Sequence, residues 1–393
     1  MADWLVAGAG IGGLATALAL QGIGLQTQVW EQAESFGEVG AGIQLGPNVT
    51  RILRRWGLGE ALERQAVSPL AMLSCDALSG RELGRLDLQA AGQRYGAPFL
   101  TVHRADLHAL LLAALDPARV KAHLGHALSD VRVGADGSLA VTNTRGDLSQ
   151  AAALIGADGL WSRVRELWGT QDVPLPTGHW AYRALLPTRL LSTRWREPLI
   201  RVWMAPGLHA VHYPVRRGEW LNVVVLVEGR LPAQSGWDVP LDPGQISADV
   251  QSALRGMCRD LHDVLRPVET WRAWSLWARP DVRGPQQMAH GRVALLGDAA
   301  HPMLPYLAQG AGMAIEDAWQ LAQSVQTQGP EDVAGALADY ARARWARNAQ
   351  VQRQARRNGR IFHLSGPMAW ARNAALRWDG PRWMDQPWLY GGK

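Results

Sequence analysis

Three glycines near the N-terminus have the spacing of a loop that holds a pyrophosphate. Gly8, Gly10 and Gly13 lie between the apolar run WLVAGAG and the small-residue run IGGLATALALQGIG. Glycines permit a tight turn and a close approach of bare backbone to a phosphate, whose charge the start of a helix favours. Glu31 lies about 20 positions further on, where a carboxylate can accept hydrogen bonds from a ribose. This combination predicts an adenine dinucleotide site, but it does not distinguish FAD from NAD.

Two later stretches carry further polar residues at regular spacing. ALIGADGLWSRVRE contains Asp158, Ser162 and Arg165 after an apolar run. GDAAHPMLPYLAQGAGMAIEDA, residues 297–318, begins with a carboxylate and is rich in glycine, alanine and proline. Such residues let a backbone pass close to a flat ligand while they fix its path.

The elements that must position these residues follow from periodicity. The N-terminal strand, helix and strand form a unit of about thirty residues, the size of a parallel βαβ. Helices are expected at 104–115, 246–265, from 311 and over 331–362, with a loop at 174–178 and an irregular end after 379. Apolar runs rich in β-branched and aromatic residues predict antiparallel strands within 179–228. We therefore expect an α/β nucleotide-binding domain that a β-sheet insertion interrupts.

Composition narrows the class of protein. The chain has 393 residues, 47% of them hydrophobic, and a net charge of +5 without a long Lys/Arg run, which argues against nucleic-acid binding. Two cysteines suggest a reducing compartment, and we expect a cytoplasmic protein with neither a signal peptide nor a membrane-spanning segment. The 19 tryptophans are expected to fill core and interface positions.

Taken in order, the motifs resemble those of the single-component FAD-dependent aromatic hydroxylases, the group that contains p-hydroxybenzoate hydroxylase. The glycine loop, the Asp158 motif and the Asp298 motif are similar to the three fingerprints of that family. GAGIQLGPN, HRADL and the terminal WLYGG resemble the subgroup of salicylate hydroxylase, 3-hydroxybenzoate 6-hydroxylase and 6-hydroxynicotinate 3-monooxygenase.

The resemblance implies a fold, a cofactor and a reaction. The fold would be a Rossmann-like FAD-binding domain of the glutathione-reductase type, interrupted by a mainly antiparallel β-sheet substrate domain and ending in helices. NADH or NADPH would reduce FAD, and O2 would form a flavin hydroperoxide that hydroxylates an aromatic or heteroaromatic acid. The expected FAD-binding parts are 1–72, 101–172 and 279–393, the last with the C-terminal helices, and the substrate parts are 73–100 and 173–278.

The resemblance also implies cofactor contacts. Asp298 would bond the ribityl–pyrophosphate region, Arg104 the phosphate or ribityl side, and Asp158 either the cofactors or only its own turn. The segment beside the isoalloxazine ring would lie between Pro302 and Gly312, and the remaining expected contacts are Gly42, Gly310 and Ala311. Arg104 could instead be an exposed residue at a helix start, and His301 is interpreted as structural.

The substrate side is expected on the β-sheet insertion and in the loop after Asp298. His212 is the first choice for the base that removes a phenolic proton, with Arg183, His209 and Tyr213 as further candidates. Tyr306 could bond a substrate hydroxyl or carboxylate. Pro305 stands where 3-hydroxybenzoate 6-hydroxylases carry a glutamine, which sets this chain apart from them.

Several alternatives stay open at this point. The enzyme could act on a larger apolar substrate as an epoxidase or hydroxylase, or the chain could bind FAD without hydroxylating. No metal site is expected. A predicted helix carries many arginines, and we expect a solvated face or a homodimer contact there: Arg342, Arg344, Arg347, Arg353, Arg356, Arg357 and Arg360.

Overall fold

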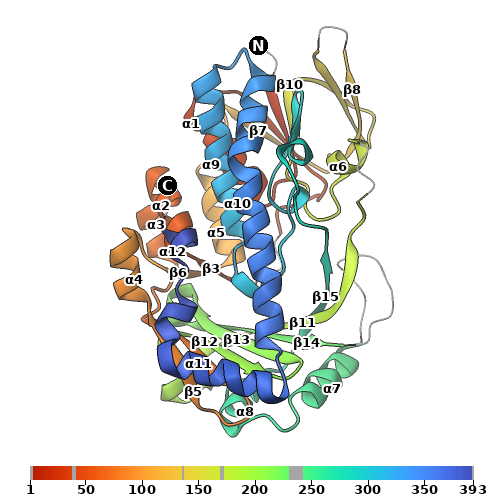
Figure 1. The fold of residues 1–393 in the computed structure, drawn as a ribbon. Helices are drawn as coiled ribbons and strands as arrows, with labels where there is room; N and C mark the ends of the chain where they lie inside the picture. Colours follow the sequence, from red (N-terminus) through yellow and green to blue (C-terminus); the bar gives the residue numbers. More distant parts are fainter. Residues whose placement is uncertain (1–2, 38–40, 135–136, 169–171, 230–241, 392–393) are drawn as a thin grey trace. The chain divides into compact units, whose positions relative to one another are not determined.

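The computed structural model describes residues 3–37, 41–134, 137–168, 172–229 and 242–391. The chain forms two compact units (Figure 1). Unit 1 comprises Met1–Val39, Ala105–Leu175 and Ala278–Ala355, and unit 2 comprises Gly40–Arg104, Pro176–Trp277 and Arg356–Lys393. Both units are thus built from segments far apart in the sequence. The domain boundaries expected from the sequence stay a prediction.

Unit 1 is built on an eight-stranded sheet. Its main path runs β16-β17-β10-β1-β2-β7, and β8 and β9 form a hairpin that pairs with β10. The central strands are parallel, as the βαβ pattern predicts. The bounds are β1 Asp3–Ala7, β2 Thr27–Glu31, β7 Val120–Leu124, β8 Leu128–Val133, β9 Leu139–Asn143, β10 Leu148–Gly156, β16 Ala289–His290 and β17 Val293–Leu295.

Small residues bring the helices of unit 1 close together. A Cβ on Gly12 would lie 3.0 Å from Leu296 Cδ1 and 3.3 Å from Ala314 Cβ, so α1 and α9 pack with little space between them. The helices that contribute to this unit are α1 Ile11–Gly22, α5 Arg104–Ala113, α6 Arg163–Leu167, α9 Gly310–Gln328 and α10 Val333–Phe362, whose last residues belong to unit 2.

A buried network of charges joins α9 and α10 to the loop after β17. The fully buried carboxylate of Asp317 accepts from Arg344 Nε at 2.7 Å, Asn348 Nδ2 at 3.0 Å and Gly297 N at 3.2 Å, and it lies 2.5 Å from His301 Nε2. Burial raises the pKa of Asp317, but the charges of His301 and Arg344 hold it below the usual 3.8. The carboxylate therefore stays ionised and fixes the loop.

Unit 2 is built on a seven-stranded sheet of order β15-β11-β14-β13-β12-β4-β5 and a two-stranded pair β3-β6. From β11 to β5, neighbouring strands of the large sheet are antiparallel except β12 and β4, in agreement with the mainly antiparallel fold expected from the sequence. The bounds are β3 Gly42–Leu45, β4 Ala71–Asp76, β5 Glu82–Asp87, β6 Leu100–His103, β11 Leu175–Pro187, β12 Leu199–Ala205, β13 Leu208–Val215, β14 Trp220–Glu228 and β15 Arg272–Ala278.

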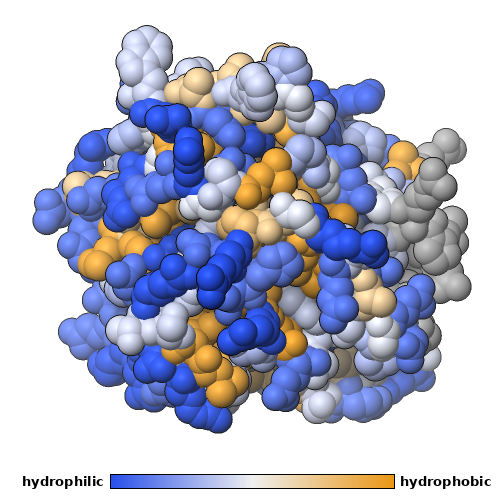
Figure 2. Space-filling model, turned by 90° about the horizontal axis from the view of Figure 1, so that it is seen from below, coloured by the Kyte–Doolittle hydropathy of each residue, from blue (hydrophilic) through white to orange (hydrophobic). Residues whose placement is uncertain are grey.

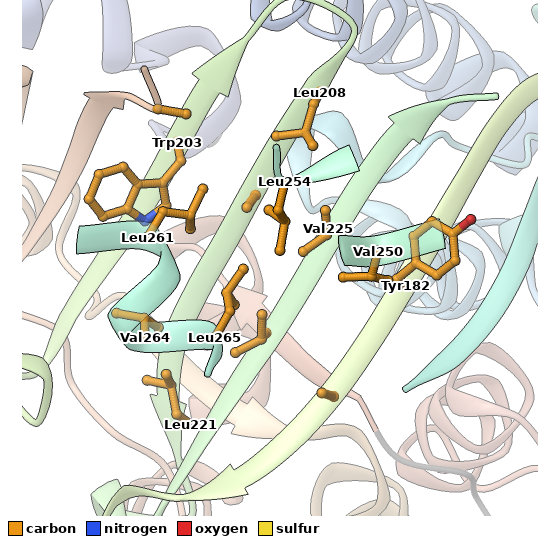
Figure 3. Packing of buried hydrophobic residues seen from close by; sticks show 14 of the residues in the cluster. Tyr182, Trp203, Leu208, Leu221, Val225, Val250, Leu254, Leu261, Val264 and Leu265 are labelled. Carbon is orange, nitrogen blue, oxygen red and sulfur yellow. The ribbon is translucent and has the colours of Figure 1, made fainter. Parts of the chain in front are cut away.

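The two faces of the large sheet have different surroundings. Face A, which carries Tyr182, Trp203, Leu208 and Val225, packs against apolar residues of α7 and α8 (Figure 3). Face B carries the alternate residues, among them Arg183, His209, Tyr213 and Asn222. The remaining helices of unit 2 are α2 Pro47–Arg55, α3 Gly59–Glu63, α4 Leu88–Tyr95, α7 Pro243–Ala253, α8 Arg259–Leu265, α11 Gly366–Met384 and α12 Pro387–Tyr390.

Four local expectations are wrong. Strand β11 starts at Leu175, inside the expected loop, and the helix expected over 246–265 is two helices, since Gly256 adopts φ +80° between them. Most of the end of the chain is helical, because α11 continues to Met384 across a kink at Asp379 and α12 follows. Arg344 does not belong to a solvated face, whereas Arg342, Arg353, Arg357 and Arg360 are exposed.

Tryptophans of the core and of the surface occupy different parts of the chain. Six tryptophans are buried as expected: Trp4, Trp30, Trp180, Trp195, Trp203 and Trp271. Three tryptophans on α11 are exposed: Trp370, Trp378 and Trp383.

On the face drawn in Figure 2, hydrophobic residues form several separate patches among hydrophilic ones. Within the described residues, no helix is long and apolar enough to cross a membrane.

The Asp317 network generates a stability prediction. Replacement of Arg344 by Met removes the arginine that pairs with the buried Asp317 and one of the two arginines that pair with Glu316, which keeps Arg347. Removing one partner of a buried ion pair costs about 3–5 kcal/mol, so the urea midpoint of unfolding should fall strongly. Arg353→Met on the exposed face of α10 is the control and should change stability by less than about 0.5 kcal/mol. Equal midpoints for both variants would contradict the assigned role.

Candidate active site

The glycine loop of unit 1 is shaped by close backbone contacts. Gly8 adopts φ +99°, and a Cβ on Gly13 would lie 1.8 Å from Gly8 O, so neither position accommodates a side chain. A Cβ on Gly10 would meet nothing within 4 Å. Gly10 is the N-cap of α1, and no described side chain caps this helix end. The loop therefore presents bare backbone and a helix N-terminus, which fits a pyrophosphate.

Glu31 is held beside this loop at the end of β2. Its Oε2 accepts from Ala9 N at 2.7 Å and its Oε1 accepts from Ala33 N at 2.9 Å. Because β1 and β2 are parallel neighbours, their carboxyl ends meet at one edge of the sheet. The structure thus brings Glu31 to the glycine loop, and its contact with a ribose stays a prediction.

The Asp158 motif holds its own turn and the Asp298 loop. Asp158 accepts from Ser162 Oγ at 2.6 Å, from Arg163 N at 2.7 Å and from Val164 N at 3.1 Å. Burial raises its pKa, and these hydrogen bonds oppose the rise. Arg165 donates to the carbonyls of Ala299 and Ala300 at 3.1 and 3.0 Å. These contacts support the turn-holding reading of Asp158, and a direct cofactor contact of Asp158 stays a prediction.

The segment after β17 approaches the start of α9. Asp298 is exposed, and its Oδ1 lies 3.9 Å from where a Cβ on Gly310 would be. Pro302 is buried and its carbonyl accepts from Gln352 Nε2 at 3.1 Å. A short 3-10 turn, Pro305–Leu307, then contains the buried Tyr306, and the next residue, Ala308, has φ +53°.

Helix α9 begins at Gly310, earlier than the start near Gly312 expected from the sequence, and no described side chain caps it. Gly310 and Ala311 are half-buried and Gly312 is buried. This second helix N-terminus also favours a negative ligand group. Unit 1 thus holds most of the predicted cofactor residues at the two uncapped helix starts and the adjoining loops.

In unit 2, Gly42 lies against the residues of face B. Its N–H donates to Asn222 Oδ1 at 2.6 Å, and a Cβ there would lie 2.7 Å from Tyr213 Cε2. Arg104 starts α5 with an exposed side chain, and its N–H donates to Ala41 O at 2.9 Å. The charges of Arg104 and Tyr213 both influence Arg183, so these residues lie in one region of the unit.

Arg183 is a cation without a carboxylate partner. Its guanidinium lies 5.1 Å from the ring centre of Trp274, and within the described part of the chain it forms no ion pair. Burial lowers its pKa, and the neighbouring Tyr213 opposes this effect. Burial also raises the pKa of the Tyr213 phenol, which interacts with Gln44. Both side chains belong to face B and can meet one ligand there.

His212 lies on face A, on the opposite side of the sheet from Tyr213. Its ring packs between Trp195 and Trp203, with centre distances of 6.0 and 6.2 Å. Neither ring nitrogen has a hydrogen-bond partner among the residues that the structure describes. Burial, and next the charge of Arg201, lower the pKa of His212 from 6.5 to about 3. These surroundings are those of a neutral core residue.

His209 is the histidine of β13 that belongs to face B with Tyr213. It is buried, and burial lowers its pKa well below 6.5. The sequence pattern places both histidines on one strand, and strand alternation assigns them to opposite faces. Both faces carry packed apolar residues: α7 and α8 cover face A, and Phe362 and Leu376 pack on the face-B residues Val202, Met204 and Val211. The surroundings of each ring therefore distinguish the two histidines, since His209 has an imidazole partner in His363.

Comparison with known proteins agrees with this arrangement. Residues 1–355 match the FAD binding domain family. The chain is 38% identical over 391 residues to 3-hydroxybenzoate 6-hydroxylase of Polaromonas naphthalenivorans, which covers 98% of this chain and 95% of that protein. The chain belongs to the family of FAD-dependent aromatic hydroxylases.

Other known proteins are similar to this chain over most of their length. 6-Hydroxynicotinate 3-monooxygenase of Bordetella bronchiseptica is 37% identical over 352 residues, 88% of this chain and 89% of that protein. The crystal structure of Klebsiella pneumoniae HpxO with FAD and uric acid has a TM-score of 0.82 at 26% identity, over 95% of this chain and 92% of that one. The resemblance seen in the sequence is confirmed, and the protein is an FAD-dependent monooxygenase.

The glycine loop of this hydroxylase generates a prediction about FAD binding. Gly10→Ala should leave the fold intact but weaken FAD binding by about tenfold or more, because the new methyl group enters the space that a pyrophosphate would take. Gly13→Ala should destabilise the fold itself, since its Cβ collides with Gly8 O. FAD titration by fluorescence and thermal unfolding of the apoprotein separate the two effects.

Gly22 provides the control in the same helix. A Cβ there would meet nothing within 4 Å, so Gly22→Ala should alter neither FAD affinity nor unfolding. If Gly10→Ala bound FAD as tightly as Gly22→Ala, the loop would not be the pyrophosphate site.

Proposed function

We propose that this hydroxylase adds one oxygen atom of O2 to a hydroxylated aromatic or heteroaromatic acid, with NADH or NADPH as the reductant. The observation that carries the proposal is Arg183 on face B, a cation to which no described carboxylate is paired. A carboxylate of the substrate supplies the missing charge. Tyr213 on the same face offers a hydroxyl to the ligand.

Bound FAD supplies the redox chemistry, namely the reduction of O2 and the transfer of one oxygen atom to the ring. In our proposal Gly8, Gly10 and Gly13 hold the pyrophosphate, and Glu31 accepts from the ribose. Asp298 and Arg104 contact the ribityl and phosphate side, while Gly42 gives close backbone access. The residues beside the isoalloxazine ring are Pro302, Gly310, Ala311 and Gly312, and Asp158 and Arg165 hold the loops in place.

The base that removes the proton of the ring hydroxyl is His209 in this proposal. His209 shares face B with Arg183 and Tyr213, whereas His212 lies among tryptophans on face A. Removal of the proton increases electron density on the ring and favours attack on the oxygen donor. The sequence-based preference for His212 stays untested, and the geometry of the sheet weighs against it.

Tyr306 and Pro305 shape the substrate side of the loop before α9. Tyr306 is buried and belongs to a 3-10 turn that Pro305 begins. We propose that the phenol of Tyr306 orients the substrate, and that the rigid Pro305 supports substrates different from those selected by a glutamine at this position.

We also propose a cytoplasmic location, which the two free cysteines Cys75 and Cys258 support, and a homodimer.

The reaction is tested with FAD-loaded protein and a panel of acids: salicylate, 3- and 4-hydroxybenzoate, 6-hydroxynicotinate and anthranilate. We expect one of them to accelerate NADH or NADPH oxidation and to yield a product that has gained one oxygen. Acceleration by none of them would favour the larger apolar substrate or the non-hydroxylating flavoprotein. Arg183→Met should raise KM for the accepted acid at least about tenfold, because the carboxylate loses its cation.

The identity of the base is tested with two matched variants on one strand. His209→Gln should lower kcat by about a hundredfold, since general bases contribute about 10²–10⁴ to the rate. His212→Gln should keep kcat within about threefold, because its ring has no polar partner in the described residues. The reverse pattern in steady-state kinetics with the accepted acid would return the role to His212.

A further inference from the structure

A chain of two hydrogen bonds leads away from His209. His209 Nδ1 lies 2.8 Å from His363 Nε2, and His363 Nδ1 lies 2.8 Å from Glu228 Oε1. The three residues come from β13, from the residue after α10 and from the end of β14. Segments far apart in the sequence therefore build one continuous path of imidazoles and a carboxylate.

The path leads from the interior of unit 2 to water. His209 is 1% exposed and His363 is 7% exposed, whereas the side chain of Glu228 is 53% exposed. A proton that enters at His209 therefore has a connected route to a carboxylate that exchanges with solvent. Nothing in the sequence order reveals this route, because Glu228 and His363 are separated by more than a hundred residues.

The groups around the path keep its imidazoles neutral. The ring of His179 on β11 stacks on His363 at 5.3 Å, and Arg372 of α11 donates to Phe362 O beside it. Burial lowers the pKa of His209, His363 and His179. Glu228 acts in the opposite direction on His363 and His179, while Arg372 adds to the lowering at His363. Both rings of the path are thus uncharged at neutral pH.

We propose that His363 and Glu228 relay to solvent the proton that His209 removes from the substrate hydroxyl, an inference that rests on the proposed function. The substrate O–H bond breaks and its proton bonds to His209 Nε2. The proton on His209 Nδ1 moves to His363 Nε2, the proton on His363 Nδ1 moves to Glu228 Oε1, and the protonated Glu228 releases it to water. The substrate keeps the electron pair as a phenolate.

The relay resolves a conflict in the site. A base as buried as His209 resists a positive charge, yet it must accept a proton. In the relay both imidazoles only exchange tautomers, so neither becomes charged at the end of the step. His363 and Glu228 are positioning residues that act through His209 and do not touch the substrate.

The test uses the FAD-loaded enzyme and 3-hydroxy-4-nitrobenzoate, whose phenol changes colour when it ionises. In stopped-flow absorbance, Glu228→Gln should slow ionisation of the bound probe at least about tenfold. Glutamine still accepts the hydrogen bond of His363 but cannot take up a proton. Glu228→Asp should restore at least part of the rate, and probe affinity should change less than about threefold.

Glu219→Gln, on an exposed glutamate before β14, is the control and should leave the ionisation rate and the probe affinity unchanged. Normal ionisation in Glu228→Gln and His363→Gln, with slow ionisation in His209→Gln, would overturn the relay while the proposed function stands. Failure of the wild-type enzyme to hydroxylate any acid of the panel is the separate failure of that function.

A bound metal is the competing explanation of the same cluster. Donor atoms of His179, Glu228 and His363 lie within 4.8 Å of one another. Metal analysis of the purified protein decides between the two. Stoichiometric zinc that is lost in Glu228→Gln would overturn the relay, because nitrogens bound to a metal cannot pass a proton.

Discussion

The ionised carboxylate of Asp317 is the constraint on which the cofactor side of the molecule depends. It is fully buried, so it must be surrounded by donors, and Arg344, Asn348, His301 and the N–H of Gly297 provide them. Two of these donors belong to the loop after β17, and two belong to α10. The requirement to satisfy one buried charge therefore determines where that loop lies relative to two helices.

The same loop is tied to the Asp158 motif. Arg165 donates to the carbonyls of Ala299 and Ala300, and Asp158 holds the turn that carries Arg165. Beyond Pro302 the chain turns through Ala308, whose positive φ a residue with a side chain adopts only when its surroundings impose it. The surroundings of Ala308 therefore hold this backbone in one conformation.

A residue can be predicted from the sequence when the residues it acts with lie close to it along the chain. Gly8, Gly10, Gly13 and Glu31 lie within one βαβ unit, so their spacing alone indicates a dinucleotide loop. The FAD family, which the later motifs indicate together with this loop, is confirmed by the comparisons. Arg344 could not be identified in this way. In the sequence it is one of many arginines on a helix, and its burial depends on Asp317 and Glu316, which precede it in a different helix. The domain boundaries and site roles stay predictions.

The two histidines of β13 also show that a sequence pattern does not reveal contacts between distant segments. Period-two alternation separates His209 from His212 correctly, but it cannot say what covers each face of the sheet. Elements far away in the sequence do so, α7 and α8 on face A and residues of α10 and α11 on face B. The surroundings of His212 favour its neutral form, since protonation would place a charge among tryptophans without a described partner. On face B the same burial is compatible with proton transfer, because His209 has a second imidazole and a carboxylate in line behind it. Burial alone therefore does not decide whether a histidine can take part in proton transfer, because the hydrogen-bond partners of its ring matter as well.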